Sequence, residues 1–154
     1  MKITLLLLGK NKDDYIEKAV LDFIQKLKPL CKLEIKYLKD EKIHTEIEKI
    51  LNIEAEKINS TLQPKSYLIV LDEKGKQMSS NAFSRHLQQR ANQGNGHFTF
   101  IIGSAHGLSD EIKQKADLLL SLSSFTTTHQ LARVILLEQI YRVFTILRGM
   151  KYHK

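Results

Sequence analysis

The sequence predicts an α/β fold in which a mostly parallel sheet is flanked by helices. Short apolar runs that suit buried strands alternate along the chain with longer segments whose apolar residues recur at helical spacing. The length of 154 residues is typical of one domain, and no linker, internal repeat or low-complexity tract divides the chain. We therefore expect a single domain over residues 1–154.

Five apolar segments are expected to form the strands of the sheet. Residues 3–8 are continuously apolar and end at Gly9, which indicates a strand buried on both faces. A second strand begins at Leu33, where apolar and charged residues alternate. The other strands are expected over residues 67–71, 98–102 and 118–122, and a polar loop with a turn glycine over residues 72–76.

Five segments with helical spacing alternate with these strands. The first, residues 13–27, is stopped by Pro29, and Gly149 ends the last helix. Ser79 or Ser80 could cap the third helix, and Ser109 is expected to cap the fourth. The expected bounds after the first helix are residues 40–62, 79–91, 110–115 and 130–147.

The last of these helices is apolar over more than one face. Such a helix is buried on more than one side, and a subunit interface is a simple way to cover the extra surface. Glu138 and Arg142 lie four residues apart within it, a spacing that allows an ion pair. Two interpretations of the pair stay open: it is structural, or it places Arg142 for a phosphate of RNA.

The chain carries a formal net charge of +7. This charge favours a polyanionic partner such as RNA, but it could equally serve solubility alone. No apolar run approaches the ~18 residues of a membrane span. The apolar run at the N-terminus is too short for a signal peptide, and no small-residue cleavage site follows it. We expect a cytoplasmic protein with no membrane partner.

Several common kinds of site are not predicted. The one cysteine, Cys31, excludes an internal disulfide and is expected to be a small buried residue. The six histidines are not paired at ligand spacing with a second His or Cys, so we expect no metal site. No segment matches the dinucleotide fingerprint, the phosphate-binding loop or G-x-S-x-G, which argues against hydrolysis by an activated serine.

Three strand ends are unusual, and in open α/β sheets ligands bind at the carboxyl ends of the strands. Leu71 is followed by Asp72 at the first of them. Residues 103–107 contain two glycines, which would let backbone approach a ligand closely, although a plain turn is the more common explanation for such a pair. Residues 122–128 are rich in hydroxyl side chains.

Several blocks of sequence are more specific in order and spacing than any of these short motifs. These blocks are Met1-Lys2-Ile3-Thr4, Ile101-Ile102-Gly103, Leu120-Ser121-Leu122-Ser123 through Thr126, His129-Gln130-Leu131 with Arg133, Glu138-Gln139-Ile140-Tyr141-Arg142, and Tyr152-His153-Lys154. On these blocks, the whole chain resembles the H-type pseudouridine-N3 methyltransferases of large-subunit (23S) ribosomal RNA, which belong to the SPOUT superfamily.

The resemblance implies a deep C-terminal trefoil knot, a homodimer with each active site at the subunit interface, and S-adenosylmethionine as cofactor. It also implies that backbone at the three unusual strand ends holds the cofactor. The matching positions are Leu71, Gly103, Leu122, Ser123, Ser124, Phe125, Thr126 and Thr127.

Methylation of N3 of pseudouridine removes a proton from the base, and a nearby cation would stabilise the charge that develops on the ring. We expect Arg142 to supply the cation, with His129 or His153 as proton acceptor or orienting group. Ordinary hydrogen bonding is the alternative for each histidine, and packing on the last helix is the alternative to base stacking for Tyr152. The expected RNA contacts are Arg133, Arg142, Tyr152, His153 and Lys154.

Two positions depart from the family pattern. Ser104 stands where the family usually has a glycine, so its side chain either crowds the cofactor or points away. Thr128 stands where a proline is frequent, which frees a backbone N–H and makes the loop less constrained. Two other functions therefore stay open: a SPOUT methyltransferase with another RNA target, and a non-catalytic RNA-binding module derived from the family.

Overall fold

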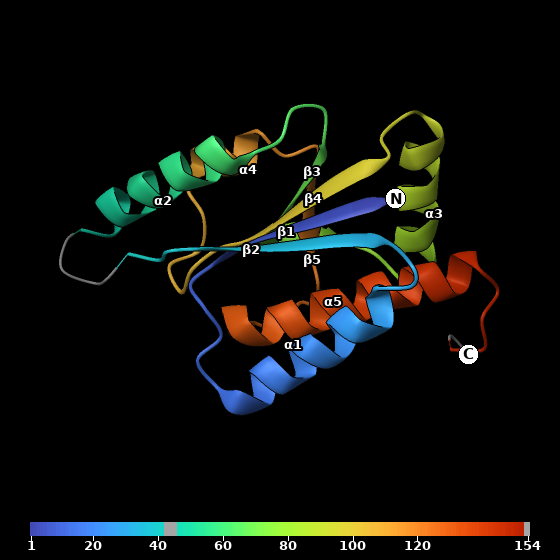
Figure 1. Cartoon of the computed structure of the whole chain (residues 1–154). Coiled ribbons are helices and arrows are strands. Elements are labelled where there is room, and N and C mark those ends of the chain that lie inside the picture. Colours follow the sequence, from blue (N-terminus) through green and yellow to red (C-terminus); the bar gives the residue numbers. More distant parts are fainter. Residues whose placement is uncertain (42–45, 153–154) are drawn as a thin grey trace.

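The computed structural model describes residues 1–41 and 46–152. Their strands form a five-stranded sheet in the order β2-β1-β4-β3-β5, and every pairing in it is parallel (Figure 1). The predicted α/β class with a parallel sheet is confirmed. The strands are β1 (Lys2–Leu8), β2 (Lys32–Leu38), β3 (Tyr67–Gln77), β4 (His97–Ile102) and β5 (Leu118–Ser121).

Helices cover both faces of this sheet (Figure 1). One face packs against α1, α3 and α5, and the other against α2 and α4. The alternation of strands and helices predicted from the sequence is present throughout. The helices are α1 (Asp14–Leu27), α2 (Ile47–Thr61), α3 (Ser80–Asn92), α4 (Asp110–Gln114) and α5 (His129–Leu147).

Strand β1 shows how the two cores arise. Ile3, Leu5 and Leu7 belong to the core under α1, α3 and α5, whereas Leu6 and Leu8 belong to the core under α2 and α4. Successive side chains of a strand point to opposite faces, so a continuously apolar strand can fill both cores. All five side chains are at most 1% exposed, which confirms the prediction of a strand buried on both faces.

Hydroxyl caps fix the first turns of three helices. The side chains of Ser79, Ser109 and Thr128 each accept a hydrogen bond from the backbone N–H three residues further on, at 3.2, 3.4 and 3.2 Å. These bonds satisfy donors that a helix start otherwise leaves unpaired. Ser79, rather than Ser80, therefore caps α3. Thr128 caps α5, a role that a proline at this position could not fill.

Helix α2 begins at Ile47, so the expected start at residue 40 is wrong. Asp40 and Glu41 are not helical, and residues 42–45 lie outside the described part of the chain. The reason is tertiary. The backbone N–H of Glu41 donates to Glu54 at 3.2 Å, and Lys57 donates to the backbone oxygen of Lys39 at 3.0 Å. Side chains of α2 therefore hold this segment beside the helix.

Strand β3 is longer than expected, because the chain returns to the sheet after the polar residues. Leu71 and Lys76 both pair with Leu120 of β5. Residues 72–75 between them therefore do not pair with β5 and form an irregularity within the strand. Gly75 packs directly on the backbone of β5: a Cβ there would lie 2.7 Å from the carbonyl carbon of Leu120. The trefoil knot implied by the resemblance stays a prediction.

Helix α5 packs between α1 and α3, which accounts for much of its wide apolar surface (Figure 1). Leu136, Leu137, Ile140 and Val143 have no exposed surface within the single chain. Leu131, near the start of the helix, is 42% exposed. The subunit interface expected on this helix therefore stays a prediction, with less apolar surface available than the sequence pattern indicates.

Candidate functional site

A cleft of about 920 Å³ lies at the carboxyl ends of β4, β5 and the first half of β3, which ends at Leu71. Its volume falls in the range of roughly 300–1,000 Å³ that is usual for small-molecule sites. The three strand ends that the sequence singled out therefore meet in one cleft, together with the start of α5. Of the eight expected cofactor positions, Ser124 is not among the residues that line it; the seven that do are Leu71, Gly103, Leu122, Ser123, Phe125, Thr126 and Thr127.

The loop after β4 needs glycine at position 103. A Cβ on Gly103 would lie 2.3 Å from the backbone oxygen of Gly107, far inside van der Waals contact. The loop is closed by a hydrogen bond from the Gly107 N–H to the Ser104 carbonyl at 3.0 Å, and Gly107 has a φ of +83°. A side chain at position 103 would therefore open the loop that forms one wall of the cleft.

Ser104, which departs from the family pattern, lines the cleft but is largely buried, and its hydroxyl bonds toward α2. Its hydroxyl donates to the carboxylate of Glu54 on α2 at 2.9 Å. The same oxygen accepts the backbone N–H of His106 at 3.3 Å. The structure shows a hydroxyl directed to α2 on a residue that also lines the cleft, and its effect on the cofactor stays a prediction.

The loop between β5 and α5 presents backbone rather than regular structure. Residues 123–127 are neither helical nor part of a strand, so their amides and carbonyls lie outside any ladder. Ser123 shapes the loop, because its hydroxyl accepts the Phe125 N–H at 2.9 Å and its carbonyl accepts the Ser121 hydroxyl at 2.9 Å. Phe125 lines the cleft with 82% of its surface exposed, which is unusual for an aromatic side chain.

One ion pair lies among the residues that line the cleft. Asp72, after the first half of β3, contacts Lys113 of α4 at 2.8 Å. Burial raises the pKa of Asp72, but hydrogen bonds from Lys113 and from the Lys74 backbone outweigh it, and the pKa is lowered. A carboxylate and an ammonium therefore stand at the mouth of the cleft, beside hydroxyl and backbone groups.

His129 begins α5 and lines the cleft. Burial lowers its pKa, the positive charges of Arg133 and Lys12 lower it further, and Asp40 opposes them. The imidazole is therefore neutral near pH 7, the form that can accept a proton or a hydrogen bond. The structure thus places His129 in the cleft and leaves its chemical role a prediction.

Arg133, one turn further along α5, has no exposed surface. Its guanidinium donates to the carbonyl of Leu8 at 2.5 Å and to the side chain of Asn11 at 2.8 Å. Burial lowers its pKa, against the opposing influence of Tyr37 and Asp40. These contacts fix the chain where β1 ends, and they do not fit the direct RNA contact expected from the sequence.

Arg142 lies near the other end of α5 in a cluster of polar and aromatic groups. Glu138 accepts its Nε–H at 3.0 Å and a terminal N–H at 2.5 Å, so the ion pair expected from the spacing is confirmed. The Tyr152 ring lies 4.8 Å from the guanidinium carbon and packs edge-on against Tyr141, as the alternative to base stacking predicted. His153 and Lys154 lie outside the described residues.

Arg142 and the cleft are far apart in one chain. From His129 to Arg142, α5 rises by about 20 Å, at 1.5 Å for each residue. Figure 1 shows α5 running from the carboxyl edge of the sheet, where the cleft lies, toward the edge where the chain begins. A single chain therefore does not bring Arg142 together with His129 or Gly103.

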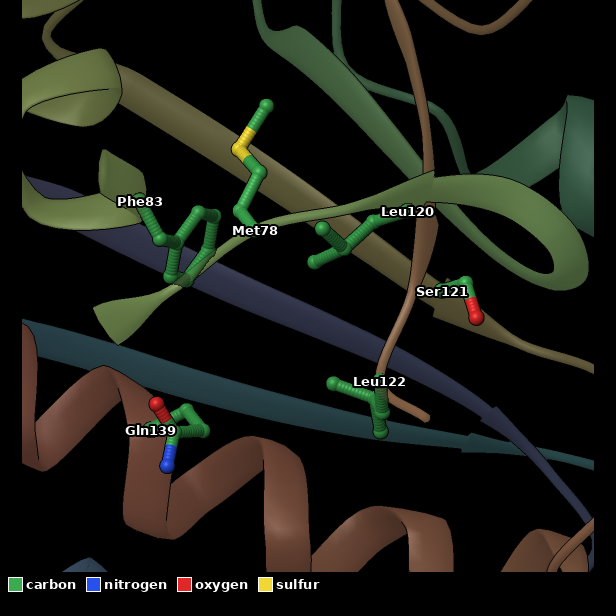
Figure 2. Close-up of a pocket in the computed structure, with 6 residues that line it drawn as sticks. All are labelled: Met78, Phe83, Leu120, Ser121, Leu122 and Gln139. Atoms are coloured by element: carbon green, nitrogen blue, oxygen red, sulfur yellow. The ribbon is translucent and has the colours of Figure 1, made fainter. Parts of the chain in front are cut away.

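A second, smaller hollow lies between β5 and the helices α3 and α5. Figure 2 shows its six lining residues, with Gln139 of α5 facing the strand from below. Its volume of about 40 Å³ could hold a few water molecules but no nucleoside. Three residues line both spaces, namely Leu120, Ser121 and Leu122. The larger cleft is therefore the candidate site.

Other sites considered from the sequence find no counterpart in the part of the chain that the structure describes. Within it, no group of three or more His, Cys, Asp or Glu side chains is placed to hold a metal ion. Over the same residues, no helix is long and apolar enough to span a membrane. Cys31 is only partly buried, but burial raises its pKa to about 11, so it stays a protonated thiol.

Sequence reasoning missed two residues that shape this site. Glu54 is 1% exposed and bonds the loop after β4, and Lys113 pairs with Asp72. A signal for Glu54 was present, because it stands at helical spacing between Ile50 and Ile58 in the apolar stripe of α2. Lys113 carries no such signal, since a lysine on a short charged helix is ordinary.

Two comparisons with known proteins match the whole length of the chain or nearly all of it. The sequence profile of the family described as "Predicted SPOUT methyltransferase" matches residues 1–153. The chain is 42% identical, over 159 aligned residues, to a protein of Halothermothrix orenii named "Ribosomal RNA large subunit methyltransferase H". The alignment covers 100% of both chains. Both matches extend over essentially the full length, and the chain belongs to the SPOUT methyltransferase family.

Proposed function

We propose that the chain is a single-domain, S-adenosylmethionine-dependent methyltransferase that modifies N3 of a pseudouridine in large-subunit (23S) ribosomal RNA, as a homodimer in the cytoplasm. The observation that carries the proposal is the cleft at the three strand ends, within a chain whose full-length relative is named for large-subunit ribosomal RNA. The cleft supports cofactor binding, the surroundings of Arg142 support its role in methyl transfer, and the distance between the two supports a dimer.

The cleft fits a nucleoside cofactor that carries charged groups. Its volume suits a ligand of that size, and Phe125 offers an exposed aromatic ring at its wall. Backbone of residues 123–127 lies outside helix and sheet, where amides and carbonyls can bond polar edges. Asp72 and Lys113 supply one charge of each sign, which suits a ligand with both an ammonium and a carboxylate.

When bound, S-adenosylmethionine supplies an electrophilic methyl group on a sulfonium. The residues of the chain must then hold the base in line with that methyl group and stabilise negative charge on the ring. Arg142 is always cationic and Glu138 fixes the direction of its guanidinium, so it suits this task. His129 is neutral near pH 7 and can accept a hydrogen bond or the N3 proton.

A dimer would resolve the separation between Arg142 and the cleft. The two lie at opposite ends of α5, about 20 Å apart, which is too far for both to touch one base. In a symmetric dimer, the end of α5 from one subunit can meet the cleft of the other. Leu131, Tyr15 and Leu21, which are 42%, 69% and 47% exposed, offer apolar surface for such an interface.

The proposed RNA contacts are Arg142 and Tyr152, together with His153 and Lys154. The side chain of Arg142 keeps 25% of its surface exposed, and Tyr152 is 38% exposed. The net charge of +7 favours an RNA partner through release of counterions. Arg133 is left out of this set because its side chain is fully buried.

The test uses methyl groups labelled in the cofactor. The purified chain is incubated with ribosomes, or with free ribosomal RNA, from a strain that lacks the corresponding activity. Mass mapping of the product should find one added methyl group on N3 of a single pseudouridine in large-subunit RNA. Methylation at another nucleotide would favour a different RNA target. Cofactor binding without any transfer, or no cofactor binding, would favour a non-catalytic module.

A further inference from the structure

We infer that Glu54 is a positioning residue for the cofactor loop: through Ser104, its buried carboxylate holds the loop after β4 in the shape that lines the cleft. The inference rests on the proposed function, because it assumes that the cleft binds the cofactor. Glu54 itself does not line the cleft and touches no reacting group in this role.

The carboxylate of Glu54 is buried against an apolar core. Its side chain is 1% exposed, and its neighbours along α2, Ala55 and Ile58, belong to the core under the helix. Burying an ionised or polar group costs free energy unless hydrogen bonds replace those to water. Two bonds do so here: Oε2 accepts the Ser104 hydroxyl at 2.9 Å, and Oε1 accepts the Glu41 N–H at 3.2 Å.

Each bond ties α2 to a different segment at the carboxyl edge of the sheet. Glu41 follows β2 at the outer edge, and Ser104 follows β4 in the middle of the sheet. Helix α2 thus serves as a fixed support between them. An apolar residue at position 54 would fill the core equally well, so the carboxylate is needed for what it bonds rather than for packing.

Ser104 transmits this support to the backbone of the cleft. Its hydroxyl accepts the His106 N–H at 3.3 Å while it donates to Glu54, and its carbonyl accepts the Gly107 N–H at 3.0 Å. Gly103 packs against the Gly107 backbone in the closed loop. The bond to Glu54 therefore restrains the whole turn from outside the cleft.

A loop with fewer restraints would spend less time in the binding-competent shape, which weakens apparent affinity by that fraction. Loss of the bond should therefore act mainly on cofactor affinity. The rate of methyl transfer at saturating cofactor depends on groups elsewhere in the site and should change little. This separation distinguishes positioning from a general loss of structure.

The test measures the dissociation constant for S-adenosylhomocysteine by calorimetry on the full chain. Ser104→Ala removes the hydroxyl, and with it the bonds to Glu54 and to the His106 N–H. Glu54→Leu removes both bonds of the carboxylate and leaves the bond between Ser104 and His106 in place. Each variant should raise the constant about tenfold or more, the loss expected for one strong hydrogen bond. Glu54→Gln keeps an amide oxygen that can accept from Ser104 and should stay within about threefold. Glu56→Leu makes the same exchange at an exposed position of α2 and should change nothing.

Two further readouts complete the test. In Ser104→Ala, the KM for the cofactor should rise about tenfold with the affinity, while kcat stays within about twofold and the melting temperature within a few degrees. Unchanged affinity in both Ser104→Ala and Glu54→Leu would overturn the inference and leave the proposed function standing. Failure of the unmodified chain to bind S-adenosylhomocysteine would overturn both.

Discussion

The two ends of α5 carry arginines in opposite surroundings. Arg133, near the N-terminal end, has no exposed surface and bonds the chain at the end of β1. Arg142, near the C-terminal end, keeps a quarter of its side chain exposed and pairs with Glu138 beneath Tyr152. A buried cation that bonds backbone stabilises the fold, whereas a partly exposed cation can meet a substrate. The same residue type on one helix therefore stands in two different environments.

Under the proposed function, the difference also separates cofactor binding from catalysis. The N-terminal end of α5 lies against the cleft, through His129 and the loop after β5. The C-terminal end lies about 20 Å away along the helix and holds the proposed catalytic cation. Substitutions at the first end should therefore change cofactor affinity or stability, and substitutions at the second should change the rate of transfer.

The largest expected effect is on the rate, at the C-terminal end. Arg142→Ala should lower kcat about a hundredfold to a thousandfold, the usual consequence of removing a group that stabilises transition-state charge. The affinity for S-adenosylhomocysteine should stay within about twofold, because Arg142 does not line the cleft of its own chain. Single-turnover transfer and calorimetry measure the two quantities. Unchanged turnover would remove Arg142 from the mechanism.

The next effect is on binding, at the cleft. Gly103→Val places a side chain where a Cβ would already lie 2.3 Å from the Gly107 oxygen, so the loop must open. We expect the dissociation constant for the cofactor product to rise at least about a hundredfold. Gly96→Val is the matched control, because a Cβ at Gly96 meets no atom within 4 Å. Retained affinity in Gly103→Val would contradict the loop assignment.

A third effect compares the two arginines directly. Arg133→Met leaves the Leu8 carbonyl without its buried donor and should lower the free energy of unfolding by about 2–3 kcal/mol. Arg142→Met breaks a partly exposed ion pair and should cost at most about 1 kcal/mol. Urea unfolding of both variants supplies the numbers. Equal losses would show that burial does not separate the roles of these residues.

The smallest effect is a pH dependence at the N-terminal end. Burial and the nearby cations lower the pKa of His129 below its ordinary value of 6.5. Between the lowered pKa of the folded chain and 6.5, His129 binds more protons in the unfolded chain than in the folded one. Stability therefore falls as the pH drops below 6.5. His86 and His97 shift in the same direction, again mainly through burial.

Thermal melts from pH 7.5 to pH 5 measure this dependence. The melting temperature of the unmodified chain should decrease toward low pH, and His129→Asn should decrease less. His106 serves as a matched histidine in the same cleft, exchanged in the control His106→Asn. A melting temperature that rises on acidification of the unmodified chain would contradict the lowered pKa values.

Local patterns in the sequence predicted much of the fold. The apolar run of β1 predicted a strand buried on both faces, and Ser79 and Ser109 predicted two helix starts, because such signals depend on neighbouring residues alone. The early start assigned to α2 was wrong because Glu41 is held by Glu54, thirteen residues away. The return of β3 to the sheet at Lys76 likewise depends on a partner strand that no local pattern reveals.

The candidate site was predicted in part. Topology brings the ends of β3, β4 and β5 together, so Leu71, Gly103 and Leu122 could be expected to share a cleft. The burial of Arg133 could not be anticipated, since helical spacing does not show which neighbouring loop covers a side chain. Nor could the bond of Ser104 to Glu54, which joins residues fifty positions apart.

One measurement tests most directly whether binding and chemistry come from different subunits. Chains carrying Gly103→Val and Arg142→Ala are co-expressed with different affinity tags, and the mixed dimer is purified through both. If each site combines the cleft of one subunit with Arg142 of the other, one of the two sites is intact. Transfer of labelled methyl to ribosomal RNA should then recover to about half of the activity of the unmodified dimer, although each variant alone is inactive. A mixed dimer as inactive as its parents would contradict the shared site.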